Sequence, residues 1–198
     1  MFVTFEGVDG SGKTTQAELL AEWLRAEGRE VLSTREPGGT ALGERVRRLL
    51  LDGEQMGAWA EAALFAAARA EHVERAIAPA LGDGSDVVCD RYLDSSVAYQ
   101  GIARGLGEQR VRELSLIVTR GLLPERTFLL LVDPAVARSR ASGERDRIER
   151  EEDAFMERVD AAYRQLAAHE PERIVALDGS REPSVVAEEV REHVRALL

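Results

Sequence analysis

A glycine-rich stretch near the start of the chain has the residue types needed to bind phosphate groups. It reads Gly7-Val8-Asp9-Gly10-Ser11-Gly12-Lys13-Thr14, with Thr15 next. Glycines at this spacing let backbone N–H groups turn toward phosphate oxygens, and the lysine adds a full positive charge beside them. The hydroxyl of Thr14 can ligate Mg²⁺. The order matches the Walker A pattern, so it predicts an ATP-binding loop with Lys13 as a catalytic cation.

The flanks of this loop agree with that prediction. A short apolar run, residues 1–6, precedes it as a strand would, and Leu19, Leu20, Trp23 and Leu24 follow at helical spacing. A helix N-terminus at this place adds partial positive charge toward a bound phosphate. The alternative is a glycine-rich turn that happens to precede a helix, and the position between strand and helix argues against it. The loop alone does not identify what receives the phosphate.

Two further polar segments follow predicted strands. Residues 35–40, Arg-Glu-Pro-Gly-Gly-Thr, follow the strand 30–34, and Asp90-Arg91-Tyr92 follows the strand 86–89. The carboxyl ends of parallel strands meet at one edge of a sheet, so both segments should face the same crevice as the loop. Asp90 resembles a Walker B position that holds Mg²⁺, and Arg91 could bind a phosphate. The alternatives are a simple turn for the first segment and a surface salt bridge for the second.

A charged stretch at about 138–150 fits poorly into a compact core. It holds Arg138, Arg140, Arg145, Arg147 and Arg150, interleaved with acidic residues. A solvated helix could have this composition. In a phosphate-binding protein, arginines of this kind can cover ATP, exclude water and neutralise charge as a phosphoryl group moves. We therefore predict an arginine-rich lid here.

Strands and helices are predicted to alternate along the whole chain. The predicted strands are residues 1–6, 30–34, 86–89, 127–132 and 173–177. Helices are predicted at residues 13–28, 40–51, 56–81, 107–119, from 134, at 155–169 and at 184–198. This alternation predicts an α/β protein of one domain, residues 1–198, with a five-stranded parallel sheet covered by helices on both faces. Together with the loop, it indicates the P-loop NTPase fold.

Composition narrows the possible partners. The 198 residues are 44% hydrophobic and 31% charged, and the formal net charge is −10. An acidic chain is a poor binder of nucleic acid or anionic membrane, so we expect neither as a partner. The one cysteine, Cys89, cannot form an intramolecular disulfide. There is no signal-peptide pattern, and no apolar run reaches the roughly 20 residues that span a bilayer, so we expect a cytoplasmic protein.

Taken together, these segments resemble bacterial thymidylate kinases over nearly the whole chain. The matching pieces are Phe5-Glu6-Gly7 leading into the loop, Thr34 to Thr40, Asp90-Arg91-Tyr92, Ser95-Ser96, Ala98 to Gly101, and Asp146 to Glu149. The resemblance implies conversion of dTMP and ATP to dTDP and ADP with Mg²⁺, by a homodimer. It implies direct in-line transfer without a covalent intermediate, since the dTMP phosphate is already a nucleophile.

The resemblance also implies roles for individual residues on the dTMP side. Asp9 would contact the 3′-hydroxyl and help to organise the phosphate and the metal ion. Phe65 would stack on thymine, although an aromatic residue on an apolar helix is more often part of the core. The remaining residues implied to bind dTMP are Arg35, Arg47 and Arg91 at the phosphate, Arg69, Ser96 and Gln100 near the base, Tyr99 near the sugar, and Pro37 and Ser95 beside them.

On the ATP side, the chain is similar to the members that supply arginine from the lid, because its loop has none. We therefore expect Arg138 and Arg140 to bind ATP, and Arg140, Arg147, Arg91 and Asp9 to act with Lys13 in catalysis. Ser142 stands before Gly143 where some relatives carry another arginine. The expected metal ligands are Thr14, Asp90 and Glu149, of which Glu149 could instead support the lid by ion pairing.

Other readings stay open at this point. The chain lacks a Thr-Lys-x-Asp or Asn-Lys-x-Asp motif for reading guanine, which argues against a GTPase. A P-loop kinase for another nucleotide or a deoxynucleoside would share the loop and the lid. A non-catalytic, ATP-binding regulatory module would bind ATP without transferring its phosphate to an acceptor.

Overall fold

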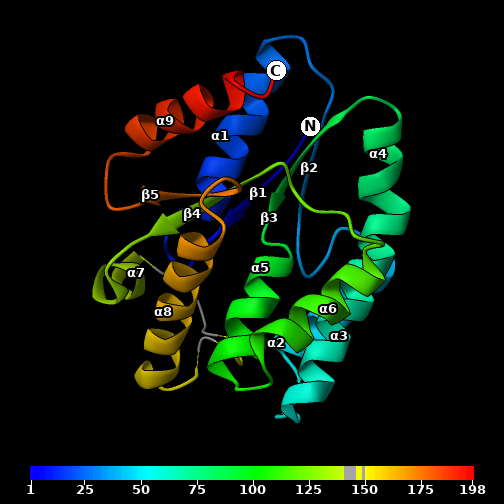
Figure 1. Cartoon of the computed structure of the whole chain (residues 1–198), viewed down its shortest axis with the longest axis vertical. Coiled ribbons are helices and arrows are strands. Elements are labelled where there is room, and N and C mark those ends of the chain that lie inside the picture. The colour runs from blue at the N-terminus through cyan, green and yellow to red at the C-terminus, as the bar shows by residue number, and fades with distance from the viewer. Residues whose placement is uncertain (141–145, 149) are drawn as a thin grey trace.

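The protein is built on a central parallel sheet. The computed structural model describes residues 1–140, 146–148 and 150–198. Five strands pair in the order β2-β3-β1-β4-β5, and every neighbouring pair is parallel (Figure 1). The strands are β1 (Phe2–Glu6), β2 (Val31–Arg35), β3 (Asp86–Asp90), β4 (Arg126–Leu131) and β5 (Ile174–Asp178). The predicted fold class, including the five parallel strands, is confirmed.

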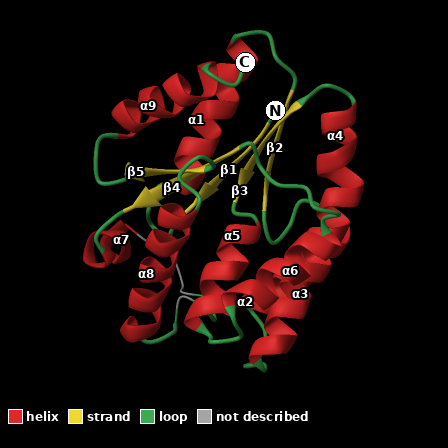
Figure 2. Ribbon diagram, in the orientation of Figure 1, coloured by secondary structure: helices red, strands yellow, loops and turns green. Residues whose placement is uncertain are grey.

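Helices cover both faces of the sheet (Figure 2). They are α1 (Lys13–Ala26), α2 (Ala41–Leu51), α3 (Ala58–His72), α4 (Ala78–Gly82), α5 (Leu93–Ser96), α6 (Glu108–Val118), α7 (Pro134–Arg140), α8 (Asp153–His169) and α9 (Pro183–Arg195). Helices α1 and α9 pack together on one face with an apolar cluster that includes Leu20, Leu24 and Val190. A second cluster, with Leu93, Val159 and Tyr163, fills the opposite face under α5 and α8.

The inner strands are apolar because helices cover both of their faces. All five residues of β1 are buried, and so is the middle of β4, Thr127 to Leu130. Strands of this kind are typical of parallel sheets between two helical layers. The edge strands β2 and β5 are only partly buried and mix apolar with polar residues. The layers therefore hold the carboxyl ends of the strands together at one edge.

Two helical segments differ from the prediction. The helix expected at 56–81 contains a wider, π-helical turn at Val73–Ile77 between α3 and α4. The segment after β3 was not predicted as helix, yet α5 continues as a π-helical stretch, Val97–Ala103. Such wide turns are often found at functional sites, and this one carries Tyr99 and Gln100. No helix in the described part of the chain is long and apolar enough to cross a membrane.

Candidate active site

A cleft of about 660 Å³ opens at the carboxyl ends of the strands. Glu6, Arg35 and Asp90 end neighbouring strands, and the register pairs Arg35 and Phe5 with Asp90. A smaller pocket adjoins the cleft, and four residues line both: Asp9, Glu36, Arg47 and Arg91. The predicted segments at 7–15, 35–40 and 90–92 therefore meet at one edge of the sheet, as their positions after strands predicted.

The glycine-rich loop lies between β1 and α1 and forms one wall of the cleft. Gly7 and Gly10 have positive φ angles, 138° and 79°. A Cβ atom at Gly10 would lie 2.1 Å from the carbonyl oxygen of Ala137, and one at Gly7 would lie 2.6 Å from that of Leu130, so glycine is required at both positions. Gly7 and Val8 lie beneath the cleft, whereas Asp9 through Thr15 line it.

Lys13 is held within this loop and buried. Its Nζ donates to the carbonyl oxygen of Val8 at 2.8 Å and lies 3.5 Å from Asp9 Oδ1. Burial and the charge of Arg91 lower the pKa of Lys13, and the carboxylates of Asp9 and Asp90 partly offset this. Ser11 Oγ is buried and has no hydrogen-bond partner within the described residues. A lysine at a helix N-terminus beside an unpaired hydroxyl is an arrangement suited to phosphate oxygens.

Thr14 and Asp90 form a pair of oxygen donors at the edge of the loop. Thr14 Oγ1 donates to Asp90 Oδ2 at 2.5 Å, and Asp90 Oδ1 is buried without a partner in the part of the chain that the structure describes. Hydroxyl and carboxylate oxygens fit Mg²⁺, which usually takes one or two protein ligands and completes its shell with water and phosphate. The described residues contain no group of three or more His, Cys, Asp or Glu arranged to hold a metal. Glu149, the third predicted ligand, lies outside the described residues.

Arg91 connects the loop to the opposite wall. Its Nη2 donates to Asp9 Oδ1 at 2.5 Å, and its Nη1 donates to Ser95 Oγ at 3.0 Å and to Tyr163 Oη at 3.3 Å. Burial raises the pKa of Asp9, but Arg91 and Lys13 outweigh it and hold that pKa well below its ordinary value. Arg91 itself has a φ of 70°, a conformation that is uncommon for a residue with a side chain. The surrounding contacts therefore fix both its backbone and its guanidinium.

Three arginines line the cleft opposite the loop: Arg35, Arg47 and Arg91. Arg47 Nη1 donates to the Pro37 carbonyl oxygen at 3.0 Å, and Arg35 Nη2 lies 3.5 Å from Glu44 Oε2. Burial, together with the charge of Arg35, lowers the pKa of Arg47. Cations that repel one another at one cleft favour an anion between them, and guanidinium groups suit phosphate.

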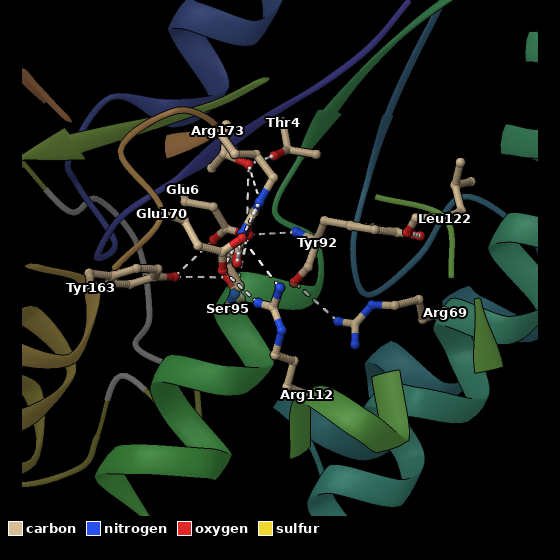
Figure 3. Close-up of polar contacts among 12 residues, drawn as sticks. Thr4, Glu6, Arg69, Tyr92, Ser95, Arg112, Leu122, Tyr163, Glu170 and Arg173 are labelled. Atoms are coloured by element: carbon tan, nitrogen blue, oxygen red, sulfur yellow. Dashed lines mark hydrogen bonds and ion pairs between the residues drawn. The ribbon is translucent and has the colours of Figure 1, made fainter. Parts of the chain in front are cut away.

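Glu6 binds Ser95 and Tyr163, the two side chains that also contact Arg91 Nη1, and Figure 3 shows its bonds to both. Its carboxylate accepts from the N–H of Tyr92 at 2.8 Å, from Ser95 Oγ at 2.5 Å and from Tyr163 Oη at 2.9 Å. Burial and the nearby Asp94 raise the pKa of Glu6 to about 7, although Arg91 and the hydrogen bonds oppose the shift. Glu6 was noted in the sequence only as part of a motif, because a single glutamate ending a strand gives no sign of the buried donors around it.

The smaller pocket is lined by residues expected near a nucleobase and sugar. Besides the four shared residues, its walls are Pro37, Leu51, Phe65, Ser95, Ser96, Tyr99, Gln100, Asp146 and Ile148. Phe65 is partly buried and also packs against the core, so both expectations for it are compatible with its position. Tyr99 Oη is buried with no partner among the described residues, and a ligand could pair with it. Burial raises the pKa of Tyr99, so its hydroxyl stays protonated at neutral pH.

Arg69 is placed differently from the other predicted base contacts. It is 1% exposed and lines neither cavity. Its Nε donates to Glu36 Oε2 at 2.7 Å, and its Nη2 donates to Ser96 Oγ at 3.0 Å. Glu36 also pairs with His72 Nδ1 at 3.1 Å. Arg69 therefore lies one layer behind the pocket and supports Ser96, and a direct bond to the base stays a prediction.

The arginines of the predicted lid separate into three positions. Arg140 lines the cleft and donates to the carbonyl oxygens of Gly179 and Ser180. Arg138 pairs with Asp153 on the surface and does not line the cleft. Arg147 does not line the cleft and contacts Glu61 and the end of α2. Arg145, Ser142 and Gly143 are outside the described residues.

Several site residues were not predicted. Glu61 and Tyr163 come from helices whose apolar patterns gave no functional signal, and Gly179 and Arg181 follow β5 in the loop before α9. Leu51 and Ile148 are apolar and became recognisable only when the pocket was assembled. The one signal available was position, since residues 179–181 also follow a strand, as segments 7–15, 35–40 and 90–92 do.

The fold and the site together define the class: a P-loop α/β protein with an arginine-lined acceptor cleft. Comparison with known proteins gives the family. The thymidylate kinase family profile matches residues 5–190. A thymidylate kinase of Bifidobacterium longum is 48% identical over 202 residues, covering 100% of this chain and 98% of the relative. One from Synechococcus sp. is 51% identical over 187 residues, with 94% and 90% covered.

A solved structure agrees with these sequence matches. The crystal structure of thymidylate kinase from Ehrlichia chaffeensis superposes with a TM-score of 0.81 at 36% identity, covering 98% of each chain. The chain therefore belongs to the thymidylate kinase family.

Proposed function

We propose that this protein transfers the γ-phosphoryl group of ATP to the 5′-phosphate of dTMP, giving ADP and dTDP. The observation that carries the proposal is the meeting of two phosphate-binding sets across one cleft. Lys13 and the loop lie on one side, and Arg35, Arg47 and Arg91 lie on the other. Membership of the thymidylate kinase family supports dTMP as the acceptor.

The chemistry requires positioning more than activation. An oxygen of the dTMP phosphate attacks the γ-phosphorus, a new P–O bond forms, and the bond to the β,γ-bridging oxygen breaks as ADP leaves. The acceptor phosphate is largely dianionic at neutral pH, since its second pKa is about 6, so no side chain has to remove a proton. The barrier is the repulsion between two anions, and fixed cations on both sides reduce it.

Each set of residues has a defined task in this proposal. Backbone N–H groups of the loop and Lys13 bind the β- and γ-phosphates of ATP, and Arg140 covers the cleft on that side. Arg35, Arg47 and Arg91 orient the acceptor phosphate. Asp9 fixes the positions of Arg91 and Lys13 relative to each other, since its carboxylate pairs with both.

Mg²⁺ fits the oxygen donors of Thr14 and Asp90, and when bound it would neutralise part of the phosphate charge.

On the acceptor side, Phe65 would stack on the thymine, and Tyr99 would lie against the deoxyribose with its unpaired hydroxyl. Crowding by the Tyr99 ring would favour a deoxyribose over a ribose.

The test is acceptor-dependent ADP formation with ATP and Mg²⁺. The purified protein is assayed with dTMP, dUMP, UMP, CMP, GMP, AMP and thymidine in turn. We expect dTMP to give the highest kcat/KM. Preference for another acceptor would replace dTMP in the proposal, and ATP binding without turnover on any acceptor would favour the regulatory module.

We also propose that the protein works as a homodimer in the cytoplasm. Leu49 of α2, Trp59 of α3 and Ile117 of α6 are large, apolar and exposed, at 55%, 49% and 75%. Helix α3 packs against both α2 and α6, so these residues lie on adjoining helices. Light scattering after size exclusion tests the dimer: the mass of a single chain would contradict it.

A further inference from the structure

Glu61 of α3 is a buried carboxylate to which the mechanism assigns no task. It is 1% exposed, yet it accepts hydrogen bonds from three different side chains. Gln100 Nε2 and Arg104 Nε donate to Oε1, both at 2.9 Å. Arg147 Nη2 donates to Oε2 at 2.7 Å, and Arg104 Nη2 donates to the same oxygen at 3.1 Å. Burial raises the pKa of Glu61, but these hydrogen bonds outweigh it and lower the pKa below its ordinary value.

The three donors come from separate parts of the chain. Gln100 lines the acceptor pocket, and Arg104 follows it at the end of the π-helical stretch. Arg147 belongs to the short segment Asp146 to Ile148, at the far end of the arginine-rich stretch, which we call the lid-exit segment. One carboxylate thus joins the pocket wall to the lid-exit segment.

Arg147 fastens the lid-exit segment to the end of α2 as well. Its backbone N–H donates to the Leu51 carbonyl oxygen at 3.0 Å, and its Nε donates to the Leu50 carbonyl oxygen at 2.8 Å. The last carbonyl groups of a helix have no partners inside the helix, and a guanidinium there also meets the negative end of the helix dipole. Arg147 therefore caps α2 while it pairs with Glu61.

This anchoring determines part of the pocket wall. Asp146 and Ile148, the two neighbours of Arg147, line the acceptor pocket together with Leu51. Ile148 is 7% exposed, so it is packed in place. If Arg147 were released, Ile148 and Leu51 would no longer be held against each other at that wall.

The same carboxylate fixes the amide of Gln100. A carboxylate can only accept hydrogen bonds, so the NH₂ group of Gln100 must face Glu61. The amide oxygen Oε1 is then the atom left for a ligand in the pocket. With a neutral amide at position 61, which both donates and accepts, either orientation of Gln100 would be possible.

We propose that Glu61 is a positioning residue for the acceptor: by holding Arg147 and Gln100 with one carboxylate, it sets dTMP affinity without touching dTMP. This inference rests on the proposed function. It assigns Arg147 to anchoring the lid-exit segment instead of contacting the transferring phosphate. Arg104 is less dependent on Glu61, because it also pairs with Glu151 at 2.7 Å and lies over the Phe155 ring.

The test compares Glu61→Gln with Glu71→Gln. Glu71 is on the same helix, but its pair with Arg75 is at the surface, so it controls for loss of one negative charge on α3. We expect Glu61→Gln to raise the KM for dTMP about tenfold, which is the size of one lost charged hydrogen bond. The KM for ATP should stay within about twofold, and Glu71→Gln should match the wild type. Equal increases in both KM values, or an unchanged KM for dTMP, would overturn the inference.

Arg147→Met tests the same link from the other side and serves if Glu61→Gln does not fold. We expect a similar rise in the KM for dTMP, and the double variant should be no worse than the poorer single variant. Additive effects, or a fall in kcat by roughly 10²-fold with unchanged dTMP affinity, would instead place Arg147 at the transferring phosphate.

The activity of the wild type distinguishes failure of the proposed function from failure of this inference. If it does not use dTMP, the proposed function fails and the inference with it. If it does and the variants behave otherwise than expected, only the inference fails.

Discussion

The ATP side and the acceptor side of the cleft are constructed in opposite ways. On the ATP side, the proposed phosphate contacts come mainly from one continuous stretch, residues 7–15, through its backbone and a single lysine, and Arg140 and residues 179–181 complete that side. The acceptor side draws on β2, α2, α3, β3, the segment after β3 and the lid-exit segment. Buried ion pairs and hydrogen bonds, such as Glu36 with Arg69 and Glu6 with Ser95, hold those pieces together. A phosphate can be bound by a local motif, whereas a whole nucleotide needs a wall assembled by the tertiary structure.

The largest effect should come from the ATP side. We expect Lys13→Met to lower kcat roughly 10³-fold, because it removes the one full charge that the loop directs at the transferring phosphate. Dissociation of dTMP, measured by calorimetry without ATP, should change little. An equal loss of dTMP affinity would contradict the division into an ATP side and an acceptor side, because it would mean that one residue serves both.

Arg91→Ala should show the reverse pattern. The guanidinium pairs with Asp9 and is held by Ser95 and Tyr163, so its loss removes a positioned cation from the acceptor wall. We expect kcat/KM for dTMP to fall about 10²-fold, with ATP affinity largely intact. Arg120→Ala is the matched control, since Arg120 is 84% exposed and pairs with Glu74 at the surface. Loss of ATP affinity in Arg91→Ala, with Arg120→Ala normal, would contradict this division.

Tyr99→Phe should have a smaller effect. It should weaken dTMP binding, but the stability of the free protein should be unchanged or slightly higher. The Tyr99 hydroxyl is buried and unpaired within the described residues, so its removal should leave the free protein equally or slightly more stable. The KM for dTMP should rise about two- to tenfold, as expected for one neutral hydrogen bond to the ligand. Thermal unfolding and steady-state kinetics measure the two effects. Tyr163→Phe, which loses bonds to Glu6 and Ser95, should instead be less stable. A destabilised Tyr99→Phe would show that its hydroxyl is already paired.

The smallest effect on rate, but a distinct effect on stability, is expected at Glu6. Its pKa is raised from 4.5 to about 7 by burial and Asp94, with Arg91 opposing. The folded protein therefore holds this proton more tightly than the unfolded chain, and the free energy of unfolding falls as pH rises from about 4.5 to about 7. Above that pH range, Glu6 contributes a constant amount to the free energy of unfolding. The total loss is on the order of 3 kcal/mol.

Glu6→Gln cannot lose that proton. Its stability relative to the wild type should therefore increase from pH 5 to pH 7 and then stay constant, as measured by urea unfolding at several pH values. Taking the difference between the two proteins cancels the titration of the groups that do not interact with Glu6. Parallel profiles for the two proteins would show that Glu6 keeps an ordinary pKa.

Sequence reasoning recovered the parts of the site that follow local rules. The loop at 7–15, the acidic Asp90 and the arginines at 35 and 91 were all placed by their position after strands, because a parallel sheet brings those ends together. The strands were recognisable because β1 and β4 are rich in apolar residues. What local patterns left out was the helix after β3, since residues 97–103 form a π-helix, which has no helical periodicity of the ordinary kind.

The second layer of the site was not predictable from sequence patterns. Glu61 and Arg69 are ionisable residues that would ordinarily be assigned to the surface, yet both are buried. Their burial depends on partners far away in the sequence, such as Arg147 for Glu61 and Ser115 for Arg69. The resemblance to thymidylate kinases placed Arg69 at the base, but a resemblance to a motif does not reveal which neighbours already occupy a side chain.

The burial of Lys13 has a practical consequence for anyone who handles this protein. Lys13 is the only lysine in the sequence, and the amino group of Met1 lies 3.2 Å from the buried Asp86. Amine-reactive reagents would therefore find no surface lysine, and the lowered pKa of Lys13 leaves more of its amine in the neutral, nucleophilic form than an ordinary lysine has at the same pH. Any amine coupling that does reach Lys13 would therefore block the ATP site itself. The same chemistry gives a selective label, since protection of one lysine by a nucleotide would report directly on occupancy of the loop.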